Sequence, residues 1–145
     1  MVRYFAIKAK LYPTDPDDIW ACDSLMDACT DCLNGQGPMA VGGPDNFKSN
    51  AEEYFKTLDK FVGILEKRLE GHGETYLIGK HMSAADLVWA AVYFNISDCN
   101  PSSPVHEEGE AVWKKHDKAH KWAKHMAHEF KDYLSHRNNT KKHPM

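Results

Sequence analysis

The 145-residue sequence predicts an all-α fold, a bundle of five to six helices. Three observations predict it. Apolar residues recur at spacings of three and four in several segments, none of which alternates as a strand would. Stretches rich in Gly or Pro separate these segments. Residues 87–94 are apolar on every side, which is typical of a helix enclosed by other helices.

The N-terminal half predicts one short helix and two long ones. Residues 2–10 form the short helix, and after a turn at 11–13 either Thr14 or Asp15 caps the second helix, with Pro16 in its first turn. The apolar stripe of that second helix is Ile19, Cys22, Met26, Cys29 and Leu33, and Asn34-Gly35 ends it. Residues 34–46, with four glycines and two prolines, predict an exposed loop. The third helix runs from Asn46 or Ser49 to Leu69, with the stripe Phe55, Leu58, Val62, Leu65 and Leu69.

The C-terminal half opens with a helix-start signal. Ser83 is the expected N-cap and Asp86 its capping-box partner, while Met82 and Leu87 are placed as a hydrophobic staple. The apolar helix that follows is the expected centre of the core. Residues 95–109 predict a polar loop, and further helices are expected at about 110–118 and 120–136.

Charge is distributed unevenly along the chain. From Lys114 onward nine Lys and Arg stand against three acids, a net of +6, whereas the first 113 residues hold nine against eighteen, a net of −9. A basic end on an acidic body fits an acidic partner surface or a subunit interface. Nucleic acid is not expected as a partner, because the aromatic residues of this end follow helical spacing rather than a stacking array.

Cysteine and histidine patterns leave chemical alternatives open. Cys29 and Cys32 form a C-x-x-C pair, but they lie late in a helix without a second ligand pair, which favours core packing over zinc or redox chemistry. Histidines at helical spacing, His116 with His120 and His125 with His128, could in principle share a metal ion. We expect no metal site, because no further ligand completes either pair.

Cellular context follows from what the sequence lacks. No apolar run approaches the ~20 residues of a membrane span, and the start shows no secretory signal. Four cysteines without such a signal predict free thiols in a reducing, intracellular compartment. The cytoplasm is the expected location, with a ciliary or mitochondrial assembly as the alternative.

Three stretches resemble one family. Val2 to Ala6 with Leu11-Tyr12-Pro13, Leu77-Ile78-Gly79 with the Ser83–Leu87 box, and Trp122 with Tyr133-Leu134 and Arg137 are similar to the C-terminal, all-helical domain of cytosolic glutathione transferases, the sigma-like branch in particular. The resemblance implies three parts: residues 1–12 as a remnant of the inter-domain helix and linker, 13–137 as the helical domain, and 138–145 as a basic polar tail.

The same resemblance implies that catalysis needs a second part. Family members carry the glutathione site and the catalytic Tyr, Ser or Cys on a thioredoxin-like domain, which this sequence does not show. No catalytic residue and no cofactor are therefore expected, with glutathione only if a partner chain completes the site. Thr30 and Asp31 fall near a position that contacts glutathione across the family's dimer. Either they keep a vestige of that contact, or they belong to a solvated acidic stripe or a dimer seam.

Two functional classes follow from the resemblance. The first is a non-catalytic, structural subunit that binds other proteins of a larger assembly, as related domains do in translation-factor and synthetase complexes, or that forms a homodimer. The second is half of a split transferase or a ligand carrier, completed by a thioredoxin-like chain. A truncated paralogue without function is a third possibility. The candidate partner surface comprises Tyr4, Phe5, Trp20, Trp113, Lys141 and Lys142.

Overall fold

Every element is helical in the computed structural model, which describes residues 1–41, 43–72, 75–98 and 106–140. The elements are α1 (Val2–Lys8), α2 (Pro16–Asn34), α3 (Gln36–Val41), α4 (Gly43–His72), α5 (Ala84–Tyr93), the π-helical turn η1 (Phe94–Asp98), α6 (His106–Lys114), α7 (Asp117–Glu129) and α8 (Lys131–Thr140). The prediction of an all-α fold is confirmed. In this described part, no helix has both the length and the apolar character needed to cross a membrane.

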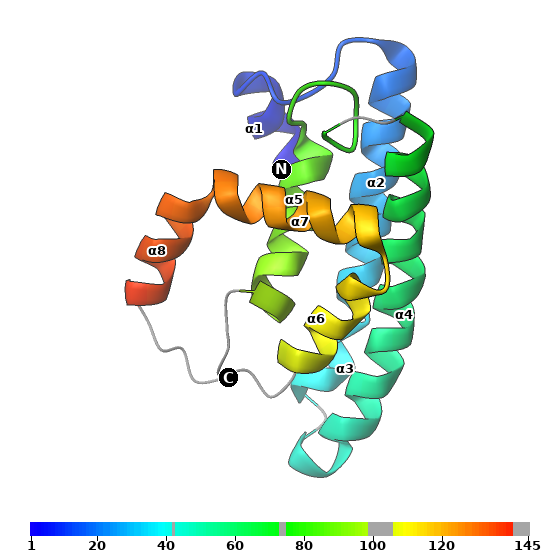
Figure 1. Cartoon of the computed structure of the whole chain (residues 1–145), viewed down its shortest axis with the longest axis vertical. Coiled ribbons are helices and arrows are strands. Elements are labelled where there is room, and N and C mark those ends of the chain that lie inside the picture. The colour runs from blue at the N-terminus through cyan, green and yellow to red at the C-terminus, as the bar shows by residue number, and fades with distance from the viewer. Residues whose placement is uncertain (42, 73–74, 99–105, 141–145) are drawn as a thin grey trace.

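The long helices α2 and α4 run side by side, and α5 lies beside them with α7 crossing in front of it (Figure 1). α5 is the centre of the core: Trp89, Val92 and Tyr93 are buried and pack with residues of α2, α4, α6 and α7. The other helices do not cover α5 on every side, because Ala91 is exposed. The short helix α1 lies at one end of the bundle, near the start of α2.

The start of α2 follows the predicted signals. Asp15 is the N-cap, and its carboxylate accepts hydrogen bonds from the backbone N–H groups of Asp17 and Asp18 at 3.0 and 3.4 Å. Pro16 occupies the first helical position, where its missing N–H costs nothing. Of the predicted stripe, Cys22, Met26 and Cys29 are buried, while Leu33 in the last turn is exposed.

The loop predicted for residues 34–46 is wrong. Most of this stretch is helical, because α3 begins at Gln36 and α4 at Gly43, earlier than Asn46 or Ser49. Both prolines stand within the first three residues of their helices. A proline there lacks only an N–H that has no helical acceptor in any case, so it does not break the helix.

The C-terminal helices also differ from prediction. The expected loop at 95–109 includes the turn η1 and the first residues of α6, which starts at His106. The break between the next two helices falls at Lys115 and His116 rather than near residue 119, with His116 as the N-cap of α7. The single helix expected at 120–136 is divided at Phe130, whose φ of −99° and ψ of 16° leave the helical region. The described residues therefore hold more helices than five to six.

Candidate interaction surface

α1 presents an apolar face to solvent. Ala6 is its buried residue, whereas Tyr4, Phe5 and Ile7 are each between 58 and 60% exposed. We call these three residues the α1 face. Tyr4 and Phe5 pack edge to face with ring centroids 5.4 Å apart, and the Lys8 ammonium lies 5.2 Å from the Tyr4 ring centroid. Apolar side chains that are exposed as a group are typical of interaction sites.

An ion-pair cluster fixes α1 on the bundle. The Arg3 guanidinium donates to Asp23 at 2.5 Å and to Asp27 at 3.1 Å, and the Tyr12 hydroxyl donates to Asp23 at 2.7 Å. The hydrogen bond from Arg3 lowers the pKa of Asp23, and the same contacts raise the pKa of Arg3. Burial, followed by the contact with Asp23, raises the pKa of Tyr12. This cluster, which sequence reasoning missed, holds the α1 face in a defined orientation.

Backbone hydrogen bonds hold the linker after α1. The N–H of Leu11 bonds to the carbonyl of Ala6 at 2.9 Å, and the carbonyl of Leu11 accepts from the N–H of Ala84 at 2.8 Å. Lys10 takes the left-handed conformation with φ of 58° to make this turn. The linker is thereby joined to the first residue of α5, the central helix.

Trp20 extends the exposed apolar area onto α2. Its side chain is 73% exposed, and it lies three and seven residues before Asp23 and Asp27, on the same side of α2. Tyr4, Phe5 and Trp20 are thus all available to a partner, as the candidate surface requires. Whether they contact one stays a prediction.

The prediction that Trp113 belongs to the candidate partner surface is wrong. It is fully buried, packs against Tyr93 with centroids 5.1 Å apart and stacks on Trp122 at 6.3 Å. The sequence places it near a turn, but α6 directs the indole into the core between α5 and α7. Lys141 and Lys142 lie outside the described residues.

A groove of about 300 Å³ lies below α1, between α2 and α5. Its lining is Met1, Val2, Arg3, Met26, Asp27, Cys29, Thr30, Leu33 and Val88. Thr30 therefore lines a groove, whereas Asp31 is exposed outside it. The Thr30 hydroxyl donates to the carbonyl of Met26 at 3.2 Å. A vestigial glutathione contact at either residue stays a prediction.

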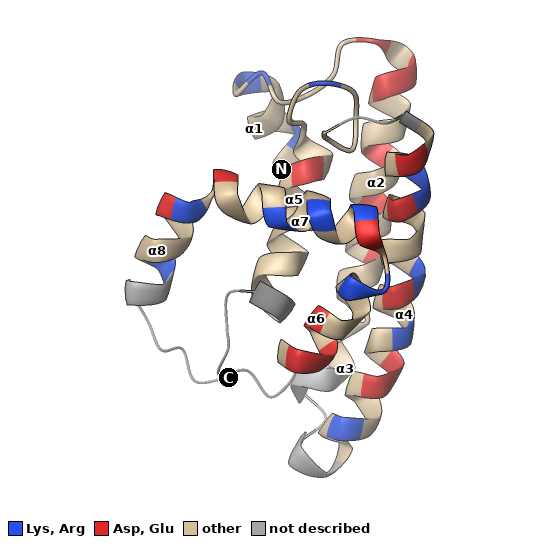
Figure 2. Cartoon of the chain, in the orientation of Figure 1, with Lys and Arg blue, Asp and Glu red and all other residues tan. Residues whose placement is uncertain are grey.

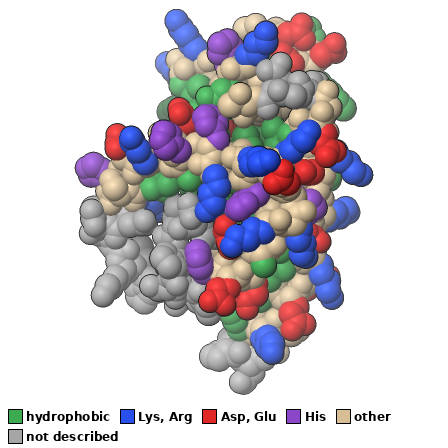
Figure 3. Space-filling view, viewed as in Figure 1, with side chains coloured by type: hydrophobic (Ala, Val, Ile, Leu, Met, Phe, Trp, Pro, Cys, Tyr) green, Lys and Arg blue, Asp and Glu red, His purple; other side chains and the backbone are tan. Residues whose placement is uncertain are grey.

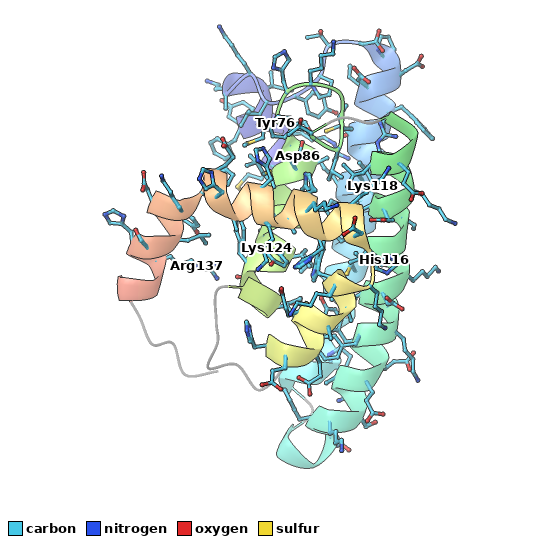
Figure 4. The ribbon with its side chains drawn as sticks, in the orientation of Figure 1. Tyr76, Asp86, His116, Lys118, Lys124 and Arg137 are labelled. Carbon is cyan, nitrogen blue, oxygen red and sulfur yellow. The ribbon has the colours of Figure 1, made fainter. Side chains whose placement is uncertain are left out.

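The Ser83–Asp86 capping box is present. The Asp86 carboxylate also accepts from the Leu77 N–H at 2.8 Å and from the Trp122 indole N–H at 3.0 Å, two contacts that spacing alone does not reveal. Figure 4 shows Asp86 at the start of α5, near α7. Met82 and Leu87 flank the box and are both half-buried, and a staple contact between them stays a prediction.

The cysteine pair belongs to the core. Cys29 and Cys32 are buried on α2, and burial raises their pKa to about 12 and about 11. Thiols with raised pKa values hold little reactive thiolate at neutral pH. The core interpretation of the C-x-x-C pair is confirmed.

His116 and His120 contact different carboxylates. His116 Nε2 lies 3.0 Å from Asp59 of α4, while His120 Nε2 lies 2.9 Å from Glu110 of α6. His125 packs on the Tyr76 ring at 5.6 Å. Figure 3 shows Lys and His side chains along α7. Among the described residues, no three His, Cys, Asp or Glu side chains group as metal ligands do.

Comparison with known proteins gives this fold a family. Residues 31–137 match the family model described as "Glutathione S-transferase, C-terminal domain". Glutathione S-transferase A of Cavia porcellus is 25% identical over 104 residues, covering 70% of this chain and 47% of the relative. Elongation factor 1-gamma 1 of Saccharomyces cerevisiae is 35% identical over 74 residues, covering 51% of this chain and 17% of the relative.

Solved structures agree on the fold. The glutathione S-transferase Blo t 8 superposes with a TM-score of 0.78 at 14% identity, covering 96% of this chain and 62% of that one. Monomeric Na-GST-3 of Necator americanus gives 0.77 at 18% identity, covering 93% and 65%. The chain thus spans about half the length of the transferase relative, or less than two thirds of either solved structure. By its family model, this chain belongs to the family of glutathione S-transferase C-terminal domains.

Proposed function

We propose that this chain is a non-catalytic protein-interaction subunit that joins a larger assembly through the α1 face. The observation that carries the proposal is that face itself, with Tyr4, Phe5 and Ile7 more than half exposed on a helix that Arg3 fixes to α2. Apolar side chains grouped in this way mark protein interfaces. The similarity to a protein named as an elongation factor supports a role outside transferase chemistry.

The proposal needs no reactive group on this chain. The thiols of Cys29 and Cys32 are buried with raised pKa values, and the described histidines that pair with carboxylates do so at helix contacts between α4, α6 and α7. These groups are used to hold the helices together. Cys29 also lines the groove beside Thr30, but its thiol donates to the Val88 carbonyl at 3.6 Å and its pKa is raised to about 12 by burial.

A second candidate is half of a split glutathione transferase or a ligand carrier. The groove of about 300 Å³ beside Thr30 and the similarity to glutathione S-transferase A favour it. A thioredoxin-like partner chain seated on α1 would border this groove. Such a complex would bind glutathione, which the interaction subunit would not do.

The native assembly tests the proposal. The full chain carrying a small tag is expressed at native level in its own cells, and the mass and composition of its complex are measured. A complex of fixed stoichiometry, larger than twice the 16.5 kDa chain, is expected for the wild type. The double variant Tyr4→Ser/Phe5→Ser is expected to leave the complex. Tyr133→Ser, which alters an exposed aromatic residue on α8, is the matched control and is expected to stay.

Three results would contradict the proposal. A monomer, or a homodimer alone, would leave no assembly for the chain to join. Equal retention of the Tyr4→Ser/Phe5→Ser variant would place the contact elsewhere. A thioredoxin-like chain at one-to-one stoichiometry with conjugating activity would establish the second candidate.

A further inference from the structure

A second groove lies at the end of the bundle, between the linker after α1 and the loop before α5. Its volume is about 270 Å³, and it is lined by residues 10–15, Asp18 of α2 and residues 78–83. Figure 2 shows the basic end of α1 and the basic residue of the loop beside the acidic start of α2. The groove shares no residue with the α1 face, so its ligand is a separate question from the partner of that face.

Charges of both signs line this groove. Lys10 and Lys80 are its two lysines, and Asp15 and Asp18 are its two acids. Asp15 is engaged as the N-cap of α2, where it accepts from two backbone N–H groups. The side chains of Lys10, Lys80 and Asp18 form no ion pair or hydrogen bond with the residues that the structure describes. Two cations and one carboxylate at the same groove are therefore left for another molecule to pair with.

The backbone at the groove holds a strained residue. Lys10, with φ of 58°, is the one non-glycine residue among those described whose φ is positive, and Gly79, with φ of 68°, lines the same groove. Glycine adopts this conformation freely, whereas a lysine there is uncommon and costs free energy. Residues held in such conformations are concentrated at functional and ligand-binding sites. The conformation of Lys10 is thus a second observation, independent of charge, that favours a ligand here.

We infer that this groove binds a small zwitterionic molecule of about dipeptide size, whose carboxylate pairs with Lys10 and Lys80 and whose ammonium group pairs with Asp18. A ligand with negative charge alone would be repelled by Asp15 and Asp18, and one with positive charge alone by the two lysines. A molecule that carries both charges forms a favourable charge-assisted contact at each. The inference goes beyond the proposed function and does not depend on it.

Size and apolar lining narrow the class of ligand further. Pockets that hold drug-sized molecules have volumes of about 300–1,000 Å³, and this groove lies just below that range. Leu11, Ile78 and Met82 supply apolar lining between the charged groups. Such a groove suits a short backbone with two charged ends and an aliphatic side chain, as in a dipeptide.

Three forms of one dipeptide test the inference on the full chain. At neutral pH leucyl-alanine carries both charges, its N-acetyl form carries the carboxylate alone, and its C-terminal amide carries the ammonium group alone. Binding is followed by NMR through the backbone amide signals of Lys10, Gly79 and Lys80, with ligand up to about 10 mM. We expect leucyl-alanine to bind about three- to fivefold more tightly than either blocked form, which is the range that exposed ion pairs allow.

Charge variants separate the two ends of the ligand. In Lys10→Gln/Lys80→Gln the carboxylate has lost its cations, so leucyl-alanine and its amide are expected to bind equally. In Asp18→Asn the ammonium group has lost its acid, so leucyl-alanine and its N-acetyl form are expected to bind equally. Lys118→Gln on α7 and Asp31→Asn on α2 change exposed charges outside the groove and are the matched controls. Both are expected to keep the wild-type preferences.

Four results would overturn the inference. Equal binding of the three forms would show that the charges do not select the ligand, and tighter binding of the N-acetyl form than of leucyl-alanine would make the ligand an anion. Wild-type preferences in both charge variants would place the binding elsewhere. If none of the three amide signals shifts over the same concentration range, the groove takes no ligand of this class. Each of these results leaves the assembly test with Tyr4→Ser/Phe5→Ser unaffected, so failure here is distinguishable from failure of the proposed function.

Discussion

At the scale of single residues, Asp86 makes hydrogen bonds beyond those of its capping box. Its fully buried carboxylate accepts from the backbone of Leu77 and Ser83, from the Ser83 hydroxyl and from the Trp122 indole. It therefore connects the segment before α5, the start of α5 and α7. A group with four donors on it is costly to remove, because each donor stays buried.

Asp86→Ala is expected to lower the free energy of unfolding by about 3 kcal/mol or more, since three buried N–H groups would lose their acceptor. Ser83→Ala is the comparison, because it removes the cap hydroxyl and leaves the Asp86 carboxylate in place; it is expected to cost about 1 kcal/mol. Urea unfolding followed by circular dichroism measures both. Equal losses in the two variants would mean that the indole and Leu77 contacts contribute nothing.

The shifted pKa of Glu110 makes the free energy of unfolding depend on pH. Burial acts to raise the pKa of this carboxyl, but the hydrogen bond from His120, the charges of Lys124 and His120, and the Tyr93 hydroxyl outweigh it, so the pKa is lowered. An acid with a lowered folded-state pKa stabilises the fold above its unfolded pKa of about 4.3. This contribution is lost as the pH falls through the folded-state value.

The free energy of unfolding of the wild type is therefore expected to fall more steeply than that of Glu110→Gln as the pH drops from about 5. Urea unfolding at a series of pH values measures the difference. Asp132→Asn, at an exposed carboxyl in the first turn of α8, is the control and is expected to follow the wild-type slope. Parallel curves for the wild type and Glu110→Gln would contradict the role given to Glu110.

At the scale of elements, the sequence predicts helix interiors better than their ends. The stripes of α2 and α4 and the capping box of α5 are readable because periodicity and caps are local properties. The starts of α3 and α4 are not, because glycine and proline are ambiguous between a loop and a first helical turn. The division at Phe130 is not predicted by any local pattern, and the Phe130 ring there packs against that of Phe94 with centroids 6.1 Å apart.

The turn before α5 requires one residue, Gly79, in the left-handed backbone conformation, and its contribution to stability can be measured. Gly79 has φ of 68°, which a side chain adopts only with strain, although nothing lies within 4 Å of an added Cβ. Gly79→Ala is expected to lower the free energy of unfolding by about 1–2 kcal/mol. Gly71→Ala, in the last turn of α4 with equally open space, is expected to be neutral or stabilising. Thermal unfolding compares the pair, and equal effects would show that conformation is not the cause.

At the scale of the whole molecule, the candidate site could be predicted in part. Tyr4, Phe5 and Trp20 are exposed, as a partner surface needs. Trp113 could not be assigned from the sequence, since its burial depends on how α6 meets α5 and α7. The Arg3–Asp23 contact escapes sequence analysis for a similar reason, since it joins residues twenty positions apart.

Three buried tryptophans connect the helices in different ways, which yields a last prediction. The indole N–H of Trp89 donates to the carbonyl of Leu25 in α2 at 2.9 Å, and that of Trp122 donates to Asp86. The indole N–H of Trp113 has no hydrogen-bond partner among the described residues. Replacing Trp by Phe removes comparable volume at each site, but only at two of them does it leave an acceptor without its donor.

Trp113→Phe is therefore expected to lower the free energy of unfolding by about 1 kcal/mol less than either Trp89→Phe or Trp122→Phe. Trp20→Phe is expected to change the free energy of unfolding by less than about 0.5 kcal/mol, because the site is exposed, and it serves as the control for the substitution itself. Urea unfolding of the four variants, followed by far-ultraviolet circular dichroism so that no tryptophan signal is needed, gives the order. If Trp113→Phe proves the most destabilising, the indole N–H contacts do not determine how firmly α2, α5 and α7 are joined, and the stacking of Trp113 between Tyr93 and Trp122 dominates instead.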